Sequence, residues 1–476
     1  MFGKRRAEWA RLAAAVGVTV LVCGSSLVVA ADASSAVILY NSMQAGHLIE
    51  ARSVFNEASF GLFSSTIDQI NDPTRLADIQ RDELTPVLGR PSSGGDGTPR
   101  ILFTGLANRA DVNSFQAGGI YGMENGNLAG YLAWQDFSSD SDVDFGSSFS
   151  SRNHSEASAT ELLLGWGQQG ENSNWGVTGG YLSRDSSALS SSTSSAANQF
   201  ETNYFTFSGA YQDHSREDFS WTVSGHVASG DMFSESVAAS SSFFSRTIWD
   251  FDNFSWGGDV RLNWYQGGDH PSAVEFLGSY SSLSGDLSRP MIYMEQSGGN
   301  DYDETVTRDD FSAWNAMLGM RWQKQLADGV DFGVGFTWEC YEIDADFAGD
   351  VTDTFYAPPE IGGFSTRSKV EGERQSIPTS VRARIGEKWT VVAGAEFWRN
   401  DYDRVDDNMF AVSPSATTEG RIQQSTVSTG TDYAMAFRYQ HSDRATAELG
   451  FRSEYYVNSL HALNISIVTL LIGLSY

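Results

Sequence analysis

The most constraining feature of this sequence is an alternation of large apolar with small or polar residues that recurs from about residue 98 to the C-terminus. The run 219–228 shows it, with Phe219, Trp221, Val223 and Val227 in one series and mainly serine, threonine and histidine in the other. Successive residues of a strand point to opposite faces, so this pattern predicts β-strands with one apolar and one polar face. Runs of about ten residues also have the length of strands that cross a bilayer.

Fifteen such runs follow one another along the chain. They lie near 112–123, 127–137, 158–168, 174–184, 202–213, 218–229, 253–265, 272–283, 310–323, 329–343, 376–386, 388–400, 430–441, 445–456 and 463–476. Short connections with turn-forming residues, such as 124–126, 327–329 and 386–387, alternate with long polar segments. The long segments lie near 138–157, 185–201, 230–252, 284–309, 344–375 and 401–429, and we expect them to be loops. Short turns on one side and long loops on the other are typical of membrane barrels, whereas a soluble sandwich has no need of such sidedness.

The order of turns and loops also predicts one further strand. The last strand and the run at 112–123 are both expected to point toward the side with the short turns. A closed barrel with an even number of strands then needs one more strand before residue 112. Residues Arg100 to Gly105 provide the candidate. We therefore predict an all-β fold, a transmembrane antiparallel β-barrel of about sixteen strands over residues 98–476, with fourteen strands as the alternative.

The N-terminal part of the chain is different. Basic residues at 4–6 and 11 precede an apolar run from Leu12 to Val22, and Val28 and Ala30 form a cleavage pair, which is the pattern of a secretory signal peptide over residues 1–30. Residues 31–97 have helix-like spacing of apolar residues and end in a Gly/Ser-rich linker. We expect this small, partly helical segment to lie either in the periplasm or as a plug in the mouth of the barrel.

Charge and cysteine content exclude several classes of function. The chain carries a formal net charge of -29, and removal of residues 1–30 takes away four basic residues and one acidic residue, which leaves -32. A chain with this large negative charge repels nucleic acid, so we expect no nucleic-acid partner. Cys340 is the only cysteine after residue 30, which rules out an internal disulfide. The seven histidines are scattered, so we predict no metal site and no cofactor.

The chain ends in a strand-length apolar segment with a terminal aromatic residue, Tyr476. Together with the signal peptide, the alternating hairpins and the sidedness of the loops, this ending resembles a Gram-negative outer-membrane β-barrel of porin-like type. The resemblance is to an architecture and not to one family. It implies location in the cell outer membrane, contact with outer-membrane lipids, and recognition by the barrel-assembly machinery through Ile472, Gly473, Leu474 and Tyr476.

If the large residues face lipid, the other series faces the lumen and contains many charged residues. These pore-lining candidates are Asp259, Arg261, Glu275, Arg321, Asp331, Glu339, Arg382, Arg384, Glu396, Arg438, Glu448 and Arg452. A simple hairpin register around residues 442–444 places Arg438 opposite Glu448. Two interpretations of these residues stay open. They could form cross-strand pairs that brace the wall, or a mixed-charge lining that orients solutes.

The expected function is a transport channel for passive diffusion of small polar solutes. The alternative is a plugged or narrow barrel with a structural, adhesion or receptor role through its acidic extracellular loops. These loops include 300–304, 344–353 and 400–407, and we interpret them as solvated acidic loops rather than as Ca²⁺ sites. A homo-oligomer is compatible with the sequence.

An enzyme at the rim of the barrel is a third class. Its candidate residues are 153–155, 213–215 and 441–443, each of which contains histidine and serine. Neighbouring residues of a strand point to opposite faces, so an adjacent histidine and serine do not by themselves form a nucleophile and base pair. We therefore expect no enzymatic activity.

Overall fold

The computed structural model describes two short N-terminal pieces and most of the chain from residue 100 onward. The described ranges are 54–63, 68–77, 100–109, 112–123, 126–144, 150–191, 194–240, 243–287, 291–296, 301–353, 360–413, 416–442, 445–457 and 464–475. The predicted signal peptide and linker, and Tyr476 of the predicted assembly signal, lie outside these ranges.

Seventeen antiparallel strands form one sheet. They are β1 (Arg100–Arg109), β2 (Val112–Met123), β3 (Gly126–Asp144), β4 (Ser150–Gln169), β5 (Ser173–Ser191), β6 (Ser194–Arg216), β7 (Phe219–Ser240), β8 (Phe243–Gln266), β9 (Ser272–Leu287), β10 (Met291–Gln296), β11 (Asp301–Ala327), β12 (Val330–Asp353), β13 (Glu360–Ile385), β14 (Trp389–Ser413), β15 (Ala416–Ser442), β16 (Ala445–Val457) and β17 (Asn464–Ser475).

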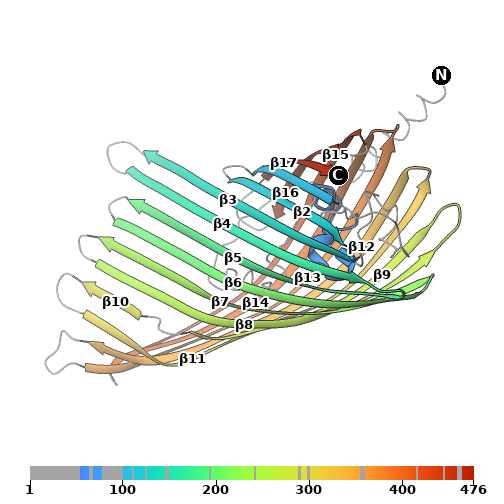
Figure 1. Cartoon of the computed structure of the whole chain (residues 1–476). Helices are drawn as coiled ribbons and strands as arrows, with labels where there is room; N and C mark the ends of the chain where they lie inside the picture. The colour runs from blue at the N-terminus through green and yellow to red at the C-terminus, as the bar shows by residue number, and fades with distance from the viewer. Residues whose placement is uncertain are drawn as a thin grey trace.

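The order of strand pairing returns to its start. β1 pairs with β17 on one side and with β2 on the other, and the remaining strands pair in chain order. β9 and β10 occupy one position, because both pair with β8 and both pair with β11. The pairing of the described strands therefore has sixteen positions. The predicted all-β, antiparallel fold class is confirmed, and a strand lies before residue 112 as expected. Figure 1 shows the long, tilted strands that surround the helical N-terminal pieces.

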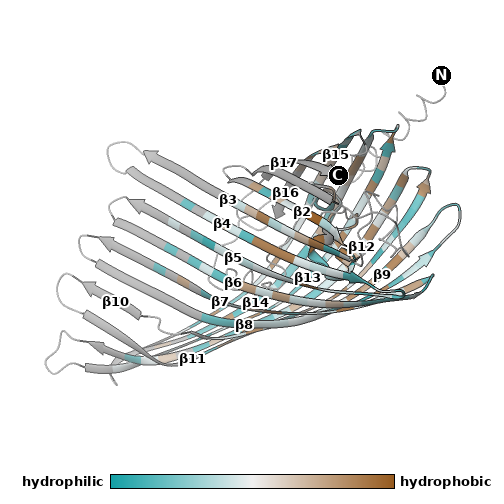
Figure 2. Ribbon diagram, in the orientation of Figure 1, coloured by the Kyte–Doolittle hydropathy of each residue, from teal (hydrophilic) through white to brown (hydrophobic). Residues whose placement is uncertain are grey.

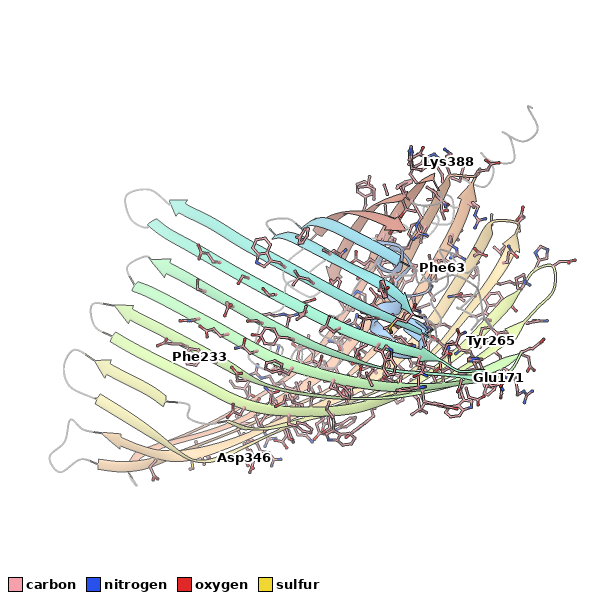
Figure 3. The ribbon with its side chains drawn as sticks, viewed as in Figure 1. Phe63, Glu171, Phe233, Tyr265, Asp346 and Lys388 are labelled. Atoms are coloured by element: carbon pink, nitrogen blue, oxygen red, sulfur yellow. The ribbon has the colours of Figure 1, made fainter. Side chains whose placement is uncertain are left out.

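The short turns are also where the sequence predicts them. β6 and β7, β11 and β12, and β13 and β14 are joined by two or three residues, and Gly329 and Gly386 take positive φ angles of 70° and 69° in two of these turns. Figure 3 places Glu171 and Lys388, both in short turns, at the same end of the molecule.

The prediction of long loops is wrong over much of their length. The strands β5 to β8 and β11 to β15 continue through most of the segments expected to be loops, for example β13 from Glu360 and β15 from Ala416. In these extensions polar residues occur in both series and the large apolar residues do not alternate regularly, as in the run 243–251, so the period-two signal of a strand is lost. The backbone ladder nevertheless continues, as in the unbroken register of β14 and β15 from Trp389↔Tyr439 to Ala411↔Thr417.

The alternation gives hydrophobic and hydrophilic bands along the strands (Figure 2). On the outer face lies a belt of exposed large apolar side chains, which includes Leu128, Leu132, Phe205, Phe207, Trp256, Val260, Trp264, Phe276, Leu318, Met320, Phe336, Trp389 and Phe451. A contiguous belt of this size marks a surface that contacts lipid or protein. Within the described residues no helix is long and apolar enough to cross a membrane.

Large side chains of the inner face lie flat across glycines of the next strand. Tyr204 of β6 covers Gly230 of β7, where a Cβ would lie 2.5 Å from its ring, and its hydroxyl accepts a hydrogen bond of 2.9 Å from Asn253 of β8. Tyr341 of β12 covers Gly372 of β13 in the same way. Glycine is required at these positions because any side chain would displace the ring.

Candidate functional site in the barrel lumen

The described N-terminal residues lie inside the barrel. They form α3 (Val54–Ser59), the 3₁₀ helix η2 (Asp68–Asn71) and α4 (Pro73–Ala77), and we call residues 54–63 and 68–77 the plug segment. α3 contacts β13 to β17, whereas α4 contacts β3 to β6. The plug segment thus reaches opposite parts of the wall and lies between them (Figure 1).

Apolar side chains of the plug segment form a common core with the inner wall. Phe55, Phe63, Ile70 and Leu76 are at most 2% exposed. They belong to one cluster with wall residues of both sides, namely Ile120, Ala129, Tyr131, Ala133, Leu163, Leu182, Tyr204, Ala228, Val392, Ala434 and Ala436. Burial of a side chain such as Phe or Leu contributes about 1.5–3 kcal/mol, so this cluster is a substantial part of what holds the plug segment.

Glycines of the wall make room for the plug backbone. A Cβ at Gly167 of β4 would lie 2.6 Å from the Pro73 carbonyl oxygen, and one at Gly394 of β14 would lie 2.5 Å from the Ala58 carbonyl oxygen. The atoms that would clash are backbone atoms, which cannot turn away as a flexible side chain can. The wall therefore carries a glycine where each helix of the plug segment approaches it most closely.

Asp72 connects the start of α4 to the wall. Its Oδ1 accepts hydrogen bonds from the Thr74 amide at 3.0 Å and the Thr74 hydroxyl at 2.7 Å, which is the arrangement of a helix N-cap. Its Oδ2 accepts a hydrogen bond from Arg261 Nη1 of β8 at 2.5 Å and lies 3.5 Å from Arg75 Nε. One carboxylate thus ends the helix and binds the barrel.

Glu275 of β9 continues this network on the wall. Its side chain is 1% exposed and lies between Arg321 of β11, at 3.3 Å, and Arg75 of the plug segment, at 3.6 Å. Glu275 and Arg321 are directly opposite in the strand register. The chain Arg261–Asp72–Arg75–Glu275–Arg321 alternates in charge from β8 through the plug segment to β9 and β11, and we call it the ionic bridge.

Two further arginines of the wall contact phenylalanines of the plug segment. The Arg382 guanidinium lies 4.9 Å from the centre of the Phe63 ring, and that of Arg438 lies 4.6 Å from the centre of the Phe55 ring. Both distances are within the range of cation–π contacts. The two arginines are also held by carboxylates of neighbouring strands, Arg382 by Asp331 at 2.9 Å and Arg438 by Glu448 at 2.7 Å.

The ionic bridge strongly affects the titration of Asp72. Burial alone would raise the pKa of this carboxyl, but the charges of Arg261 and Arg75 and the hydrogen bonds from Thr74 and Arg261 outweigh burial and lower the pKa to about 2. Because the pKa is lower when the segment is docked, ionised Asp72 stabilises docking above the ordinary value of 3.8.

Acidification should therefore weaken docking of the plug segment. The contribution of Asp72, on the order of 2 kcal/mol, is fully present above pH 3.8 and is lost as the pH falls toward 2. We expect single-channel recordings to show more open time at pH 2.5 than at pH 5. In an Asp72→Asn variant this difference should shrink, and an equal difference in both proteins would contradict the role of Asp72.

The structure places the predicted pore-lining residues as follows. Those that contact side chains of the inner face or of the plug segment are Asp259, Arg261, Glu275, Arg321, Asp331, Glu339, Arg382, Arg438 and Glu448. Arg384 is exposed, Glu396 is half-buried, and the side chain of Arg452 lies outside the described part of the chain. The predicted pair Arg438↔Glu448 is confirmed as a pair of register partners. Three of these contacts are ion pairs between neighbouring strands, Glu275–Arg321, Asp331–Arg382 and Glu448–Arg438, of the kind expected to brace the wall. A role of these residues in lining a pore stays a prediction.

Sequence reasoning missed the ionic bridge because its members are far apart in the chain. Asp72 and Arg261 are 189 positions apart. A local signal was present, because Asp72-Pro73-Thr74 has the N-cap residue followed by proline that begins many helices. This signal locates the helix but not its partner on the wall.

The candidate residues for a rim enzyme do not form a nucleophile and base pair in the part that the structure describes. The Ser215 hydroxyl donates to Asp213 at 2.8 Å, and the ring nitrogens of His214 have no hydrogen-bond partner. The side chains of 153–155 lie outside the described residues. The absence of enzymatic activity stays a prediction.

Among known proteins, no family model and no curated sequence matches this chain. Several solved structures do match this chain. The CymD monoaromatic hydrocarbon channel matches with 9% identity and a TM-score of 0.37, covering 90% of this chain and 97% of that one. A TodX monoaromatic hydrocarbon channel mutant, deltaS2, matches with 9% identity and a TM-score of 0.42, covering 90% and 99%. The ferric preacinetobactin receptor BauA from Acinetobacter baumannii matches with 8% identity and a TM-score of 0.32, covering 79% and 80%. The chain is similar to these channels and receptors in architecture alone.

Proposed function

We propose that this protein is an outer-membrane transport barrel for small solutes whose passage is controlled by the plug segment. The single observation that carries the proposal is that residues 54–63 and 68–77 pack inside the ring of strands and contact both sides of its wall. A channel for free diffusion needs an open lumen, whereas here the lumen holds folded chain.

The contacts between the plug segment and the wall support a segment that moves to control passage rather than one that is a fixed part of the wall. The arginines of the ionic bridge are partly exposed, with side-chain exposures of 24% for Arg75, 25% for Arg261 and 28% for Arg321, whereas its two carboxylates are buried. Ion pairs in contact with water exchange more readily than an apolar core. The plug segment can therefore undock without breaking the strand ladder that holds the barrel.

Location in the outer membrane is part of the proposal. The outward apolar belt provides the lipid-facing surface, and the strands extend beyond it on the side opposite the short turns. A receptor that uses these extensions to bind a ligand before transport is the second candidate function. It is favoured by the length of β11 to β15, which have 24 to 27 residues, against the 9–11 residues that about suffice to cross a bilayer.

Single-channel conductance in planar bilayers tests the proposal. We expect the full-length protein to show small or rare current steps, and a variant that lacks residues 54–77 to show frequent steps that scale with salt concentration. The variant should first be shown to have the β-sheet content of the parent by circular dichroism. Equal currents from both proteins would mean that the plug segment does not control passage, and no current from either would favour the receptor role.

A further inference from the structure

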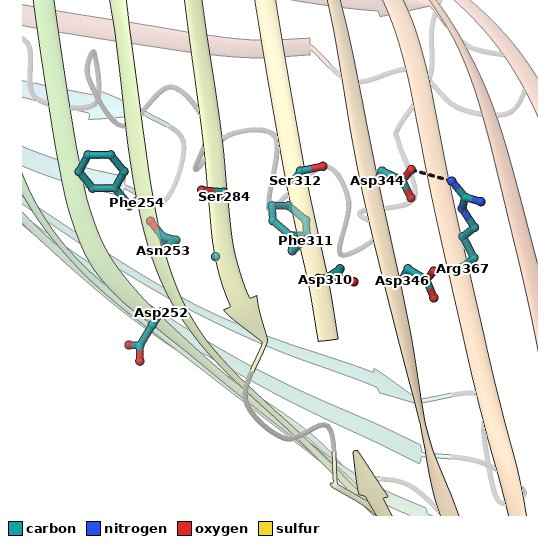
Figure 4. A pocket seen from close by; sticks show the side chains of 11 residues that line it. Asp252, Asn253, Phe254, Ser284, Asp310, Phe311, Ser312, Asp344, Asp346 and Arg367 are labelled. Atoms are coloured by element: carbon teal, nitrogen blue, oxygen red, sulfur yellow. Dashed lines mark hydrogen bonds and ion pairs between the residues drawn. The ribbon is translucent and has the colours of Figure 1, made fainter. Parts of the chain in front are cut away.

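Two arginines of the wall have a guanidinium that no carboxylate holds. Wherever the structure describes an arginine side chain of the strands, that side chain forms an ion pair with an aspartate or glutamate, except at Arg374 and Arg384 of β13. Figure 4 shows one of the ion pairs, in which Arg367 Nη2 donates to Asp344 at 2.9 Å beside a cavity. Arg374 and Arg384 are both exposed. Their charges are therefore available to a mobile ion.

Both of these side chains belong to the lumen face. Residues of a strand alternate between its faces, so Arg374 and Arg384 share the face of Arg382, which contacts Phe63 of the plug segment. The Arg374 guanidinium lies 6.0 Å from the centre of the Trp398 ring of β14, a contact that holds it without neutralising its charge.

The carboxylate opposite Arg374 is held by a different residue. Glu339 of β12 is the register partner of Arg374. Its Oε1 accepts a hydrogen bond of 2.9 Å from Asn315 Nδ2 of β11, and no ion pair joins it to Arg374 among the described residues. The guanidinium of Arg374 is thus left facing the lumen.

The plug segment lies between the two unpaired arginines. Phe63 covers Arg382 at 4.9 Å, and Arg384 comes two positions after Arg382, toward the short turn. Arg374 comes eight positions before it, about 26 Å along the strand, toward the end with the long strands. A solute that follows β13 through the lumen would therefore meet one unpaired arginine on each side of the plug segment.

Arg384 also lines a small cavity near the short turns. This cavity has a volume of about 130 Å³ and is lined by Arg384, Arg382, Gln325 and Thr390 together with Asp328 and Asp331. Asp331 is already bound to Arg382 at 2.9 Å. The volume exceeds the share of one water molecule, about 30 Å³, several times. A small anion thus has room beside the Arg384 guanidinium, with an amide and a hydroxyl as further donors.

We propose that the solute carried by this barrel has a carboxylate or phosphate group, which binds Arg374 on the long-strand side and Arg384 on the short-turn side. This inference rests on the proposed transport function and names its substrate class. The forked donors of a guanidinium match both oxyanions, and an unpaired guanidinium binds them without first leaving a protein carboxylate. The net charge of -29 does not decide the matter, because charges more than about 10 Å away are largely screened at 0.1 M salt.

Reversal potentials of the full-length protein in planar bilayers test the proposal. Gradients of potassium acetate and of potassium phosphate give the permeability of each anion relative to potassium. We expect Arg374→Gln and Arg384→Gln each to lower this ratio about two- to fivefold for at least one of the anions, the size expected for one exposed charge. Arg399→Gln is the matched control, because Arg399 lies at a similar level on the outer face, where Asp401 holds it at 3.0 Å. It should leave both ratios unchanged.

A variant with the opposite effect makes the test independent of misfolding. Glu396 lies on the lumen face opposite Pro378, between the levels of Arg374 and Arg382. Glu396→Gln removes a charge that repels anions, so both ratios should rise. Unchanged ratios in the two arginine variants, or an equal fall in Arg399→Gln, would overturn the proposal.

The same recordings separate this inference from the proposed function. A reversal potential does not depend on how often the channel opens, whereas control by the plug segment is measured by the frequency of current steps. Current steps with unchanged ratios in the two arginine variants would overturn the anionic substrate and leave transport standing. A complete absence of current steps from inserted protein would overturn both.

Discussion

Replacing Glu275 with alanine is expected to undock the plug segment and to destabilise it by about 3–5 kcal/mol, because a buried carboxylate is removed from between two arginines. Arg75 and Arg321 would then face each other without the negative charge that holds them at 3.6 Å and 3.3 Å. Trypsin cleaves after arginine, so the rate of cleavage after Arg75 measures undocking directly. We expect this rate to rise on the order of a hundredfold or more if cleavage follows the population of the undocked state.

Two companion variants separate the ionic bridge from general damage to the wall. Glu396→Ala removes a half-buried carboxylate of the predicted lumen series and should leave cleavage after Arg75 slow. Arg321→Ala combined with Glu275→Ala should cost less than the sum of the two single changes, because the residues are direct partners. Unchanged cleavage in Glu275→Ala would show that the apolar core alone holds the plug segment.

Replacing Gly167 with valine is expected to displace α4 from the wall. The new Cβ would lie 2.6 Å from the Pro73 carbonyl oxygen and 2.8 Å from the Ala77 Cα, and valine adds two methyl groups beyond it. Overpacking of this kind costs about 1–3 kcal/mol, and here the strand resists movement because β4 is paired on both sides. We expect faster cleavage after Arg75 and more frequent current steps from the same preparation.

Gly420→Val is the matched control for this steric effect. Gly420 lies on β15, and no atom lies within 4 Å of a Cβ built there. Valine is a good strand residue, so this change should be neutral for both measurements. If Gly167→Val behaved like Gly420→Val, the close approach of α4 to β4 would not be what keeps the segment docked.

The acidic loops illustrate how far a local pattern can mislead. The sequence indicates solvated loops at 344–375 and 401–429, yet β12 to β15 continue through most of them. Strand pairing beyond the apolar belt depends on backbone hydrogen bonds, which leave no trace in the pattern of side chains. Aspartates that are separate in sequence, such as Asp310 and Asp346, become neighbours only through this pairing.

The sheet, the two faces of each strand and the register next to short turns could be predicted from the sequence. These properties are local, because the period of two fixes the face and a turn of two or three residues fixes which residues lie opposite, as for Arg438 and Glu448. The position at which the plug segment docks could not be predicted in this way. The contact of Asp72 with Arg261 depends on the tertiary arrangement of the strands, which brings together residues from distant parts of the chain without any local period that would indicate the contact.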